Sequence, residues 1–575
     1  MKKLLKYMRG YGRECVLGPL FKLLEASFEL LIPLVVAAIV DTGIAGGDRG
    51  YVVKMCLVMI GLGIIGLICA VTAQFFAAKA AVGFATRLRH AVMEHILGLS
   101  YTEIDKLGTS TMVTRMTSDV NQVQNGVNLT LRLLLRSPFV VFGAMIMAFT
   151  IDFHAALTFV ALIPALCLVV FGIMLITMPM YKRVQSSLDQ VTSATLQNLS
   201  GVRVLRAFTM EQAETNAFEE HTARLQQRQR LAGRISNLMN PITLVLVNLA
   251  IIVLIRIGAL KVYDGILTQG LVIALYNYMT QILVELVKMA NLIISMTKAA
   301  ACADRVASVL EIESSQKNGN QSAENIRGAV EFRNVTAHYQ GAAEPSLEGI
   351  SFRAEPGQTI GIIGGTGSGK TTLINLIPRL YDAAQGQVLI DGVDVNDYDF
   401  ISLRQKIGIV PQKSVLFKGS IRKNLLWGNE HAAEDELWAA LDVAQAREVV
   451  KSREVELEAT VEQGGTNFSG GQRQRLAIAR ALVRKPAILI LDDSASALDY
   501  ATDAKLRMAI RNMDNPPTTF IVSQRAASVR YADLILVLDD GELVGMGTHE
   551  ELLENCSVYQ EVFYSQFPKE VKPHG

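Results

Sequence analysis

Long apolar runs dominate the first half of the chain. Four of them carry no charged side chain and approach the ~20 residues that a helix needs to cross a bilayer: residues 56–78, 155–180, 235–255 and 265–284. Two further runs are 16–40, which contains Lys22, Glu25 and Glu29, and the shorter 137–151. Glu25 and Glu29 interrupt the first run and no small-residue cleavage site follows it, so we interpret it as a helix rather than a signal peptide. The pattern predicts six membrane-spanning helices.

Two connections between these spans are too long to be loops. In residues 79–132 and 182–234, apolar residues recur at helical spacing among charged ones, so the membrane helices should continue far beyond the bilayer. We expect the chain to turn around at 107–111 and 198–208, where Gly108 and Gly201 interrupt the helical pattern.

Basic residues are concentrated on one side of the predicted bilayer. The two long connections are rich in Arg and Lys, and the remaining connections are short. The segment before the first span is also basic, with Lys2, Lys3, Lys6, Arg9 and Arg13. By the positive-inside rule these segments, and with them both chain termini, are cytoplasmic. The sequence therefore predicts a multi-pass protein of the plasma (inner) membrane.

The character of the chain changes after residue 310. Residues 311–327 are rich in Ser, Gln, Asn and Gly and are typical of a linker. Beyond them, short β-branched or Leu-rich runs alternate with helical segments, at 329–332, 359–363, 408–410, 487–491, 518–522 and 534–538. That alternation predicts a mostly parallel sheet. We expect an α-helical membrane domain over 1–310, a linker over 311–327 and an α/β domain over 328–575.

Composition excludes several classes of protein. Hydrophobic residues make up 50% of the 575 residues and charged residues 19%, against about 25% charged in an ordinary soluble protein. The net charge of +1 gives no reason to expect nucleic acid as a partner. The six cysteines lie far apart without a CxxC pair, which argues against a zinc site or a disulfide framework.

A glycine-rich segment follows the predicted strand 359–363 and opens a helical run. It fits the pattern GxxxxGK[ST], whose backbone N–H groups cradle phosphates, whose lysine meets the β- and γ-phosphates and whose last hydroxyl can hold Mg²⁺. Its residues are Gly364, Gly365, Thr366, Gly367, Ser368, Gly369, Lys370 and Thr371. A second apolar strand ends in Asp492, where a P-loop enzyme holds its Mg²⁺. Together they predict a nucleotide triphosphatase.

A third motif indicates which class of nucleotide triphosphatase the chain resembles. Phe468 is followed by Ser469, Gly470, Gly471 and Gln472, which is close to LSGGQ, and here the chain resembles the ATP-binding cassette (ABC) transporters. The resemblance covers the whole chain, because six spans with long cytoplasmic extensions and one cassette look like a half-transporter of the exporter type. It implies an α/β P-loop nucleotide-binding domain, ATP and Mg²⁺ as ligands, and a second half-transporter as partner. In this family the signature closes over ATP held by the other cassette.

The resemblance also implies roles for residues that carry little signal of their own. Tyr339 matches the aromatic residue that stacks on adenine, and Thr372 extends the phosphate-binding set. Gln412 matches the glutamine that senses Mg²⁺, so the resemblance assigns the metal to Thr371, Gln412 and Asp492. Residues 496–499 match the D-loop. The turns at 107–111 and 198–208 fall near the coupling helices, which press on the cassettes.

Two positions depart from the hydrolytic machinery of the family. After Asp492 an active exporter carries Glu, which positions and deprotonates the attacking water, whereas this chain has the shorter Asp493. About 1 Å of misplacement can cost on the order of a hundredfold in rate. Gln524 replaces the histidine that contacts the γ-phosphate, and an amide cannot carry positive charge. The chain thus resembles the degenerate-site subunit of a heterodimeric, multidrug-type exporter, with low hydrolysis alone and a signature that completes the partner's competent site.

Other functions remain open. An ATP-gated channel or a regulatory membrane subunit would also use nucleotide binding as a switch. A homodimeric exporter with two working sites would follow if Asp493 and Gln524 are tolerated variants. Ionisable residues at membrane depth (Lys22, Glu25, Glu29, Arg256, Glu285 and Lys288) either face a cavity or pair with one another. A charged cavity with many Met and Phe side chains would accept amphipathic small molecules, lipids or peptides.

Overall fold

The computed structural model describes residues 2–339, 344–494 and 498–567. Contacts within the chain divide it into two compact units. The first contains residues 1–97 and 109–312, and the second contains residues 98–108 and 313–575.

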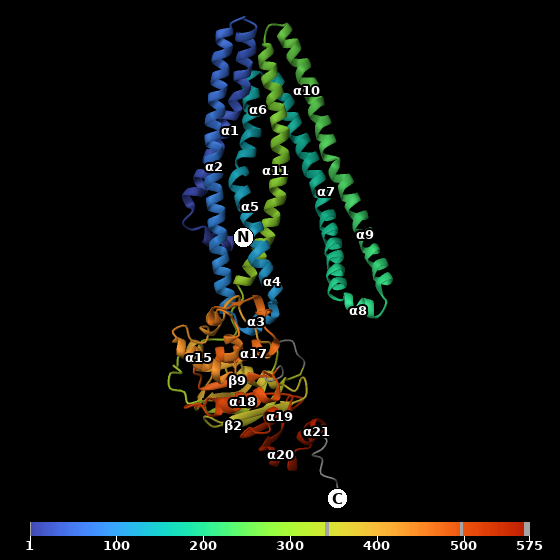
Figure 1. Cartoon of the computed structure of the whole chain (residues 1–575). Helices are drawn as coiled ribbons and strands as arrows, with labels where there is room; N and C mark the ends of the chain where they lie inside the picture. Colours follow the sequence, from blue (N-terminus) through green and yellow to red (C-terminus); the bar gives the residue numbers. More distant parts are fainter. Residues whose placement is uncertain (1, 340–343, 495–497, 568–575) are drawn as a thin grey trace. The chain divides into compact units, whose positions relative to one another are not determined.

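The first unit is built from long helices (Figure 1). In chain order they are η1 (Lys2–Met8), α1 (Gly12–Ala38), η2 (Ile39–Ile44), α2 (Arg49–Gly98), α4 (Thr109–Thr114), η3 (Arg115–Asp119), α5 (Val120–Leu133), α6 (Arg136–Ile151), α7 (Phe153–Ser200), α8 (Val202–Ala207), α9 (Glu211–Asn237), α10 (Met239–Tyr263) and α11 (Gln269–Leu310). Within the described residues they form six stretches that are long and apolar enough to cross a membrane. The predicted six spans are therefore confirmed.

The helices continue past their apolar stretches, as the charge pattern predicted. The helix α7 runs for 48 residues, and α9 packs antiparallel to it after the short α8. The first predicted turn falls at Gly108, which has φ +74° and separates α3 (Tyr101–Leu107) from α4. The second falls on the segment that contains α8. Both predicted turns therefore coincide with breaks between helices.

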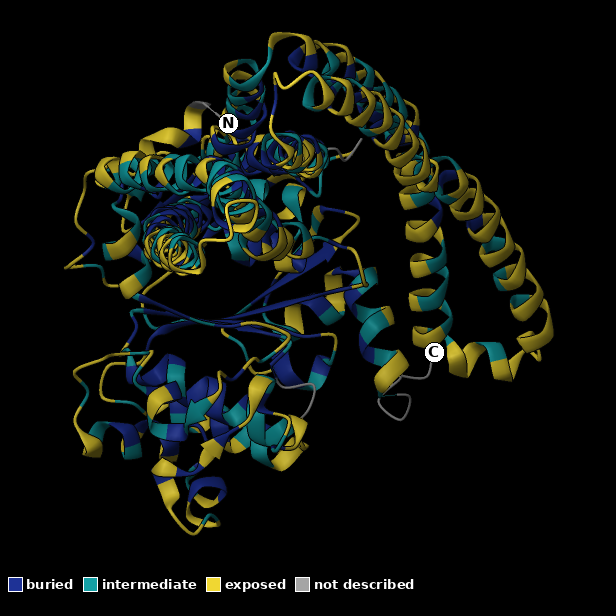
Figure 2. Ribbon diagram, turned by 90° about the horizontal axis from the view of Figure 1, so that it is seen from above, coloured by how far each residue is buried: buried dark blue, intermediate teal, exposed yellow. Residues whose placement is uncertain are grey.

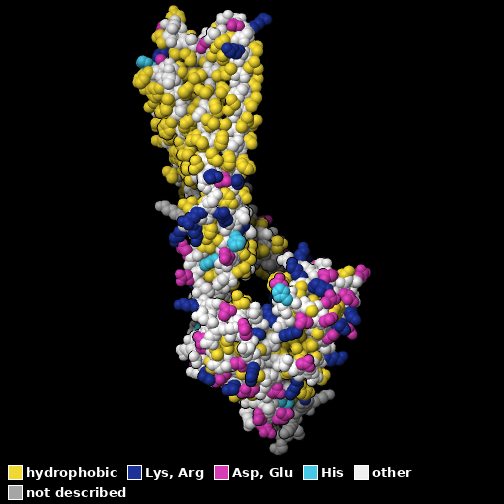
Figure 3. Space-filling view, turned by 90° about the vertical axis from the view of Figure 1, so that its left-hand side faces the viewer, with side chains coloured by type: hydrophobic (Ala, Val, Ile, Leu, Met, Phe, Trp, Pro, Cys, Tyr) yellow, Lys and Arg dark blue, Asp and Glu magenta, His cyan; other side chains and the backbone are white. Residues whose placement is uncertain are grey.

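Apolar side chains cover the outside of these helices. On α2, Leu57, Ile60, Ile64, Leu67 and Val71 are all exposed. Figure 3 shows hydrophobic side chains as a continuous band over this face, with the charged side chains towards its ends. Soluble proteins rarely expose so large an apolar area, so this band is the surface that contacts lipid.

A buried ionic cluster joins three helices of the first unit. The guanidinium of Arg136 on α6 donates to Glu29 of α1 at 2.6 Å and to Glu285 of α11 at 2.5 Å. Glu285 also accepts from Ser137 at 2.9 Å and from Lys288 at 2.9 Å. Arg136 is 6% exposed and Glu285 is 1% exposed, so each charge depends on its partners for solvation.

The remaining ionisable residues of the spans are also accounted for. Lys22 pairs with Glu25 at 2.6 Å, and Arg256 is exposed on α10. The sequence left open whether these groups line a cavity or pair with one another. The structure shows that Lys22, Glu25, Glu29, Glu285 and Lys288 are paired. Arg136, which was not predicted from the sequence, is the partner of Glu29 and Glu285.

The second unit contains two larger sheets. The six-stranded sheet has the order β12-β11-β3-β10-β9-β6, with only β12 antiparallel to its neighbour. The second is antiparallel, with the order β2-β1-β4-β5. The strands are β1 (Val330–Ala337), β2 (Leu347–Ala354), β3 (Thr359–Gly364), β4 (Gln385–Ile390), β5 (Val393–Asp394), β6 (Ile407–Val410), β7 (Gly419–Ser420), β8 (Thr460–Val461), β9 (Ile488–Asp492), β10 (Thr518–Val522), β11 (Leu534–Asp539) and β12 (Glu542–Gly547). The predicted, mostly parallel sheet is confirmed for five of the six runs, which form β3, β6, β9, β10 and β11. The run 329–332 was wrongly placed with them, because it forms β1 of the antiparallel sheet, which was not predicted.

Beyond residue 313, the α-helices of the second unit are α12 (Lys370–Leu376), α13 (Phe400–Gln405), α14 (Ile421–Leu425), α15 (Glu434–Val443), α16 (Arg447–Lys451), α17 (Gly470–Val483), α18 (Tyr500–Arg511), α19 (Ala526–Val529), α20 (His549–Asn555) and α21 (Ser557–Gln566). Of these, α12, α13, α17, α19, α20 and α21 pack against the six-stranded sheet, and α14 and α15 pack on α17. Successive residues of a strand point to opposite faces of the sheet and therefore belong to different hydrophobic clusters. Ile490 belongs to the same cluster as Phe352, whereas Leu491 belongs to the cluster of Leu476 and Leu498. Figure 2 shows these strands as buried. Burial on both faces explains why the parallel strands read as continuous apolar runs.

The polar segment 311–327 forms neither a helix nor a strand. It is nevertheless held by hydrogen bonds to the residues just before α13 in the same unit. The backbone N–H of Gln321 donates to the carbonyl of Asp397 at 2.9 Å, and the N–H of Gly319 donates to that of Tyr398 at 3.2 Å. Backbone groups thus tie this segment down although its side chains are polar.

Candidate nucleotide-binding site

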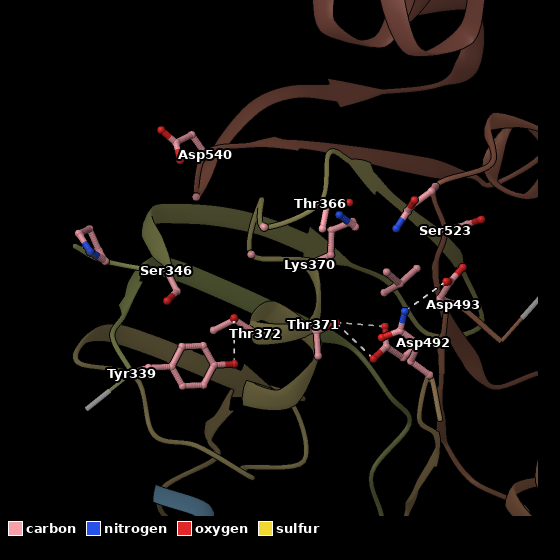
Figure 4. Close-up of a pocket in the computed structure, with 17 residues that line it drawn as sticks. Tyr339, Ser346, Thr366, Lys370, Thr371, Thr372, Asp492, Asp493, Ser523 and Asp540 are labelled. Carbon is pink, nitrogen blue, oxygen red and sulfur yellow. Dashed lines mark hydrogen bonds between the residues drawn. The ribbon is translucent and has the colours of Figure 1, made fainter. Parts of the chain in front are cut away.

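The phosphate-binding loop joins β3 to α12, as the sequence predicted. Gly367 and Gly369 have φ values of +90° and +89°, a conformation that side chains other than glycine rarely adopt. A Cβ atom on Gly369 would lie 2.5 Å from the carbonyl oxygen of Ser346. These two glycines are therefore required by the course of the backbone. The loop and the start of α12 face a cavity of about 390 Å³ (Figure 4).

Lys370, the first residue of α12, lies beneath this loop. Its ammonium donates to the carbonyl of Gly364 at 3.0 Å, to the hydroxyl of Ser368 at 3.1 Å and to the carbonyl of Gly365. It is 9% exposed, and burial lowers the pKa of Lys370, a shift that the carboxylates of Asp492 and Asp493 oppose. A phosphate entering the cavity would give this cation a stronger acceptor than the neutral groups it now contacts.

A carboxylate and a hydroxyl meet on the other side of the cavity. The hydroxyl of Thr371 donates to both carboxylate oxygens of Asp492 at 3.3 Å (Figure 4). Asp492 is 6% exposed. Burial raises the pKa of Asp492, the Thr371 hydrogen bond lowers it, and the neighbouring charge of Asp493 raises it further. This buried carboxylate would be stabilised by a cation.

Magnesium fits these oxygen atoms. Mg²⁺ prefers oxygen ligands and is commonly held by one or two carboxylates together with substrate phosphates. Thr371, Asp492 and the side-chain carbonyl of Gln412 supply such oxygens around the cavity. No group of three or more His, Cys, Asp or Glu residues that could hold a metal exists among the described residues. The protein groups therefore suit a metal that is also bound by phosphates.

Asp493 and Gln524 also line this cavity. Asp493 has a φ of +44°, a left-handed conformation that Asp tolerates better than most side chains. The amide of Gln412 donates to its carboxylate at 3.4 Å, and the amide of Gln474 donates to its backbone carbonyl at 3.4 Å. The side chain of Gln566 on α21 holds the loop of Gln524, because it donates to the carbonyl of Gln524 at 2.8 Å and accepts from the N–H of Ala526 at 2.9 Å.

Tyr339 lies at the opposite end of the cavity from Asp493 (Figure 4). Its hydroxyl lies 3.1 Å from the hydroxyl of Thr372, which is on α12. Its ring meets the ring of Tyr381 edge to face. The cavity thus has a phosphate-binding loop between an aromatic ring and a pair of carboxylates, the groups that an adenine nucleotide with Mg²⁺ requires.

The signature residues form a helix start outside this cavity. Ser469 is the N-cap of α17, where its hydroxyl accepts from the N–H of Gln472 at 3.3 Å and its own N–H donates to the Gln472 side chain at 3.0 Å. Ser469 and Gly470 are exposed, and Phe468 is buried beneath Arg453. None of the residues 468–472 is among those that line the cavity. The chain therefore presents a nucleotide pocket and a separate signature surface.

Some residues of the cavity were not expected from the sequence. They are Val522, the last residue of β10, and Pro345, Ser346, Ser523, Asp540 and Gly541, which come from loops flanking β2, β10 and β11. Their positions follow from strand order, which the sequence did not reveal. Of the predicted D-loop, residues 496–497 lie outside the described residues, whereas Asp499 is the N-cap of α18 and accepts from the N–H of Thr502 at 2.8 Å.

Two protein families match separate parts of this chain. The family described as ABC transporter transmembrane region matches residues 15–286, and the family described as ABC transporter matches residues 347–496. Together they account for most of both units.

Individual relatives extend this similarity to nearly the full length. An uncharacterized ABC transporter ATP-binding protein of Mycobacterium tuberculosis is 38% identical over 98% of this chain and 97% of the relative. The ATP-dependent lipid A-core flippase of Escherichia coli is 28% identical over 95% of this chain and 94% of the relative. The solved structure of a bacterial Atm1-family ABC exporter with ATP bound has the same fold, with a TM-score of 0.81, 22% identity, and coverage of 98% of this chain and 100% of that one.

Proposed function

This chain belongs to the ABC transporters and is an exporter-type half-transporter with one transmembrane region and one cassette, and from that premise we propose that it is the degenerate-site subunit of a heterodimer. The observation that carries the proposal is the separation of its two functional surfaces. The cavity contains Asp493 and Gln524, whereas Ser469 and Gly470 are exposed outside it. A complete site would therefore need the signature of a second half-transporter.

ATP binding at the chain's own cavity has a simple physical basis. The glycine-rich loop and Lys370 bind the phosphates, and Tyr339 stacks on the adenine ring. Thr371, Gln412 and Asp492 would hold Mg²⁺, which neutralises charge on the phosphate oxygens when bound. Thr372 fixes Tyr339 through the hydroxyl contact at 3.1 Å. The site thus retains the groups that bind ATP.

We propose that ATP is hydrolysed slowly at this cavity. Asp493 is one methylene shorter than the glutamate of an active exporter, so its carboxylate reaches the attacking water less well. Gln524 offers the γ-phosphate a neutral amide in place of an imidazole. Both changes weaken the same step, and each can cost one to two orders of magnitude.

The signature of this chain serves the partner's ATP. Ser469, Gly470, Gly471 and Gln472 begin α17, a helix of 14 residues whose N-terminus attracts anions. The partner supplies the glutamate and the histidine that this chain lacks. One of the two composite sites is then competent and the other only binds nucleotide.

The transported substrate is proposed from chemistry and from one relative. The Escherichia coli relative is named as an ATP-dependent lipid A-core flippase. The apolar membrane spans suit a molecule that carries apolar chains. We therefore assign this exporter an amphipathic lipid, peptide or multidrug-type substrate. ATP-dependent uptake of such a compound into inside-out vesicles tests transport, because a channel produces no accumulation against a gradient.

The orientation that follows is a cassette and both termini in the cytoplasm. Cysteines introduced at Gly46, between η2 and α2, and at Gly319, in the polar segment, test it. An impermeant thiol reagent added outside should label the first and spare the second. Labelling at Gly319 would overturn the orientation.

The proposed division of labour predicts the behaviour of the chain by itself. Purified in lipid nanodiscs, it should bind MgATP and hydrolyse it far more slowly than the ~1–10 s⁻¹ of an ordinary enzyme. Turnover at that ordinary rate would favour a homodimeric exporter with two working sites. If the chain binds MgATP but supports no transport with any partner half-transporter, an ATP-gated channel or a regulatory subunit would be favoured.

A further inference from the structure

One aromatic residue connects the candidate adenine-binding ring to a helix that comes from the membrane half of the sequence. The helix is α3, whose residues belong to the same compact unit as the cassette. The residue is Tyr381, which follows the phosphate-binding helix α12 along the chain. Tyr381 belongs to none of the sequence motifs described above.

On one side Tyr381 contacts Tyr339. Their ring centroids are 5.3 Å apart and the rings are inclined by 82°, an edge-to-face pair. Tyr339 is itself fixed by its hydroxyl, which lies 3.1 Å from that of Thr372 (Figure 4). A base that stacks on Tyr339 therefore acts on a ring that is tied both to the phosphate-binding helix and to Tyr381.

On the other side Tyr381 contacts α3 twice. Its hydroxyl donates to the carboxylate of Asp105 at 2.6 Å, and its ring lies 6.0 Å from that of Tyr101. Burial raises the pKa of Tyr381 well above its usual range, and the Asp105 carboxylate raises it further. The hydroxyl is thus a donor at every physiological pH, in a charge-assisted hydrogen bond of the stronger kind.

We propose that Tyr381 is a positioning residue that transmits the presence of a nucleotide base on Tyr339 to helix α3. This inference rests on the proposed function of Tyr339 as the adenine-stacking residue. When the base holds the Tyr339 ring, it holds the edge-to-face partner, and Tyr381 then fixes α3 through Asp105 and Tyr101. Phosphates alone contact the loop and the start of α12 and reach the Tyr339 ring only through the hydroxyl of Thr372, whereas the base stacks on the ring itself, so we expect α3 to respond to the base.

Hydrogen exchange at the backbone amides of residues 98–108 measures this response. The full chain is purified in lipid nanodiscs and compared without ligand, with saturating MgATP and with saturating magnesium tripolyphosphate. We expect MgATP to slow exchange in this segment by about fivefold or more and tripolyphosphate to leave it within about twofold of the ligand-free rate. Equal protection by the two ligands would overturn the inference.

The variant Tyr381→Phe isolates the hydroxyl, because it keeps the ring against Tyr339. It should bind MgATP within about twofold of the parent chain and lose at least half of the protection of residues 98–108 at saturating MgATP. Tyr398→Phe is the matched control, since it removes a tyrosine hydroxyl that donates to the carbonyl of Ile390 at 3.0 Å elsewhere in the cassette. The control should retain full protection.

Asp105 supplies the rescue test. Asp105→Ala should reproduce Tyr381→Phe, and the double variant should lose no more than either single one. Asp105→Asn keeps an acceptor oxygen and should recover part of the protection. If Tyr381→Phe weakens MgATP binding but leaves protection at saturation intact, Tyr381 only shapes the pocket and the inference is wrong. If the parent chain binds no MgATP, the proposed function is wrong, and this inference, which depends on it, is wrong as well.

Discussion

The proposed loss of hydrolysis rests on two residues of the nucleotide pocket. Asp493 has a left-handed backbone and receives a hydrogen bond from Gln412, and Gln524 lies on a loop held by Gln566. In our proposal these two side chains weaken hydrolysis and leave ATP binding in place. Binding and hydrolysis can therefore be separated at the level of single residues.

The first prediction restores the missing groups. The double variant Asp493→Glu with Gln524→His should raise ATP turnover of the purified chain at least tenfold, because the carboxylate gains about 1 Å of reach and the imidazole can carry charge. Single-turnover ATP hydrolysis measures it, with MgATP affinity as the control. Turnover that stays unchanged while ATP is still bound would place the defect elsewhere.

The second prediction concerns the buried carboxylate. Asp492→Asn should raise the stability of the nucleotide-free chain by about 1 kcal/mol, because it removes a charge whose burial is unfavourable. The same variant should lose the additional stabilisation that Mg²⁺ gives with ATP. Thermal unfolding with ATP, with and without Mg²⁺, separates the effects, and a less stable nucleotide-free variant would contradict the account of Asp492.

Among single residues, the sequence predicts the positions of those that belong to a motif but not of those that act in isolation. The spacing of Gly367, Gly369 and Lys370 encodes their geometry, because a backbone that must curl around phosphate tolerates few alternatives. Arg136 and Tyr381 belong to no motif. Their importance comes from partners more than a hundred residues away in the sequence, such as Glu285 and Asp105.

At the scale of elements, the membrane helices are joined by charge as well as by apolar packing. The helices α1, α6 and α11 converge on Arg136, and Tyr278 of α11 adds a hydrogen bond to the carbonyl of Leu30 at 2.6 Å. Because Arg136 and Glu285 are buried, removing one of them leaves the other without its main counter-charge.

The third prediction follows from that arrangement. Arg136→Leu should destabilise the chain by about 3–5 kcal/mol, and adding Glu285→Gln should recover at least half of the loss. Arg224→Leu is the control, since it breaks an exposed pair with Glu220 and should cost less than about 1 kcal/mol. Thermal unfolding in nanodiscs provides the comparison. An equally small effect of both single variants would show that the buried cluster contributes little.

Elements were predictable where one periodicity held over many residues. Six spans, their extensions and the parallel strands follow from apolar runs that are long or buried on both faces. The antiparallel strands β2 and β12 were missed because residues of different exposure alternate along them, and β4 was missed because its first three residues are exposed and only its last three are buried. Their pairing with β1 and β11 depends on topology rather than on local pattern.

At the scale of the whole molecule, the chain is one of the two half-transporters that an ABC exporter needs. Its pocket and its signature occupy different surfaces, so every complete ATP site requires a second half-transporter. If that partner carries the glutamate and the histidine, two composite sites of unequal activity result. In the proposed mechanism, ATP binding at both sites closes the cassettes, and hydrolysis at one site resets them.

The most direct test of this account compares two single variants in the heterodimer. Ser469→Ala removes a donor from the partner's site and should reduce ATP turnover by at least tenfold. Asp493→Asn changes a carboxylate that our proposal takes to be poorly placed for hydrolysis, and it should reduce turnover by less than about threefold. Steady-state ATP hydrolysis by the purified heterodimer in nanodiscs measures both. If Asp493→Asn is as damaging as Ser469→Ala, this chain's own site hydrolyses ATP and the proposed division of labour is wrong.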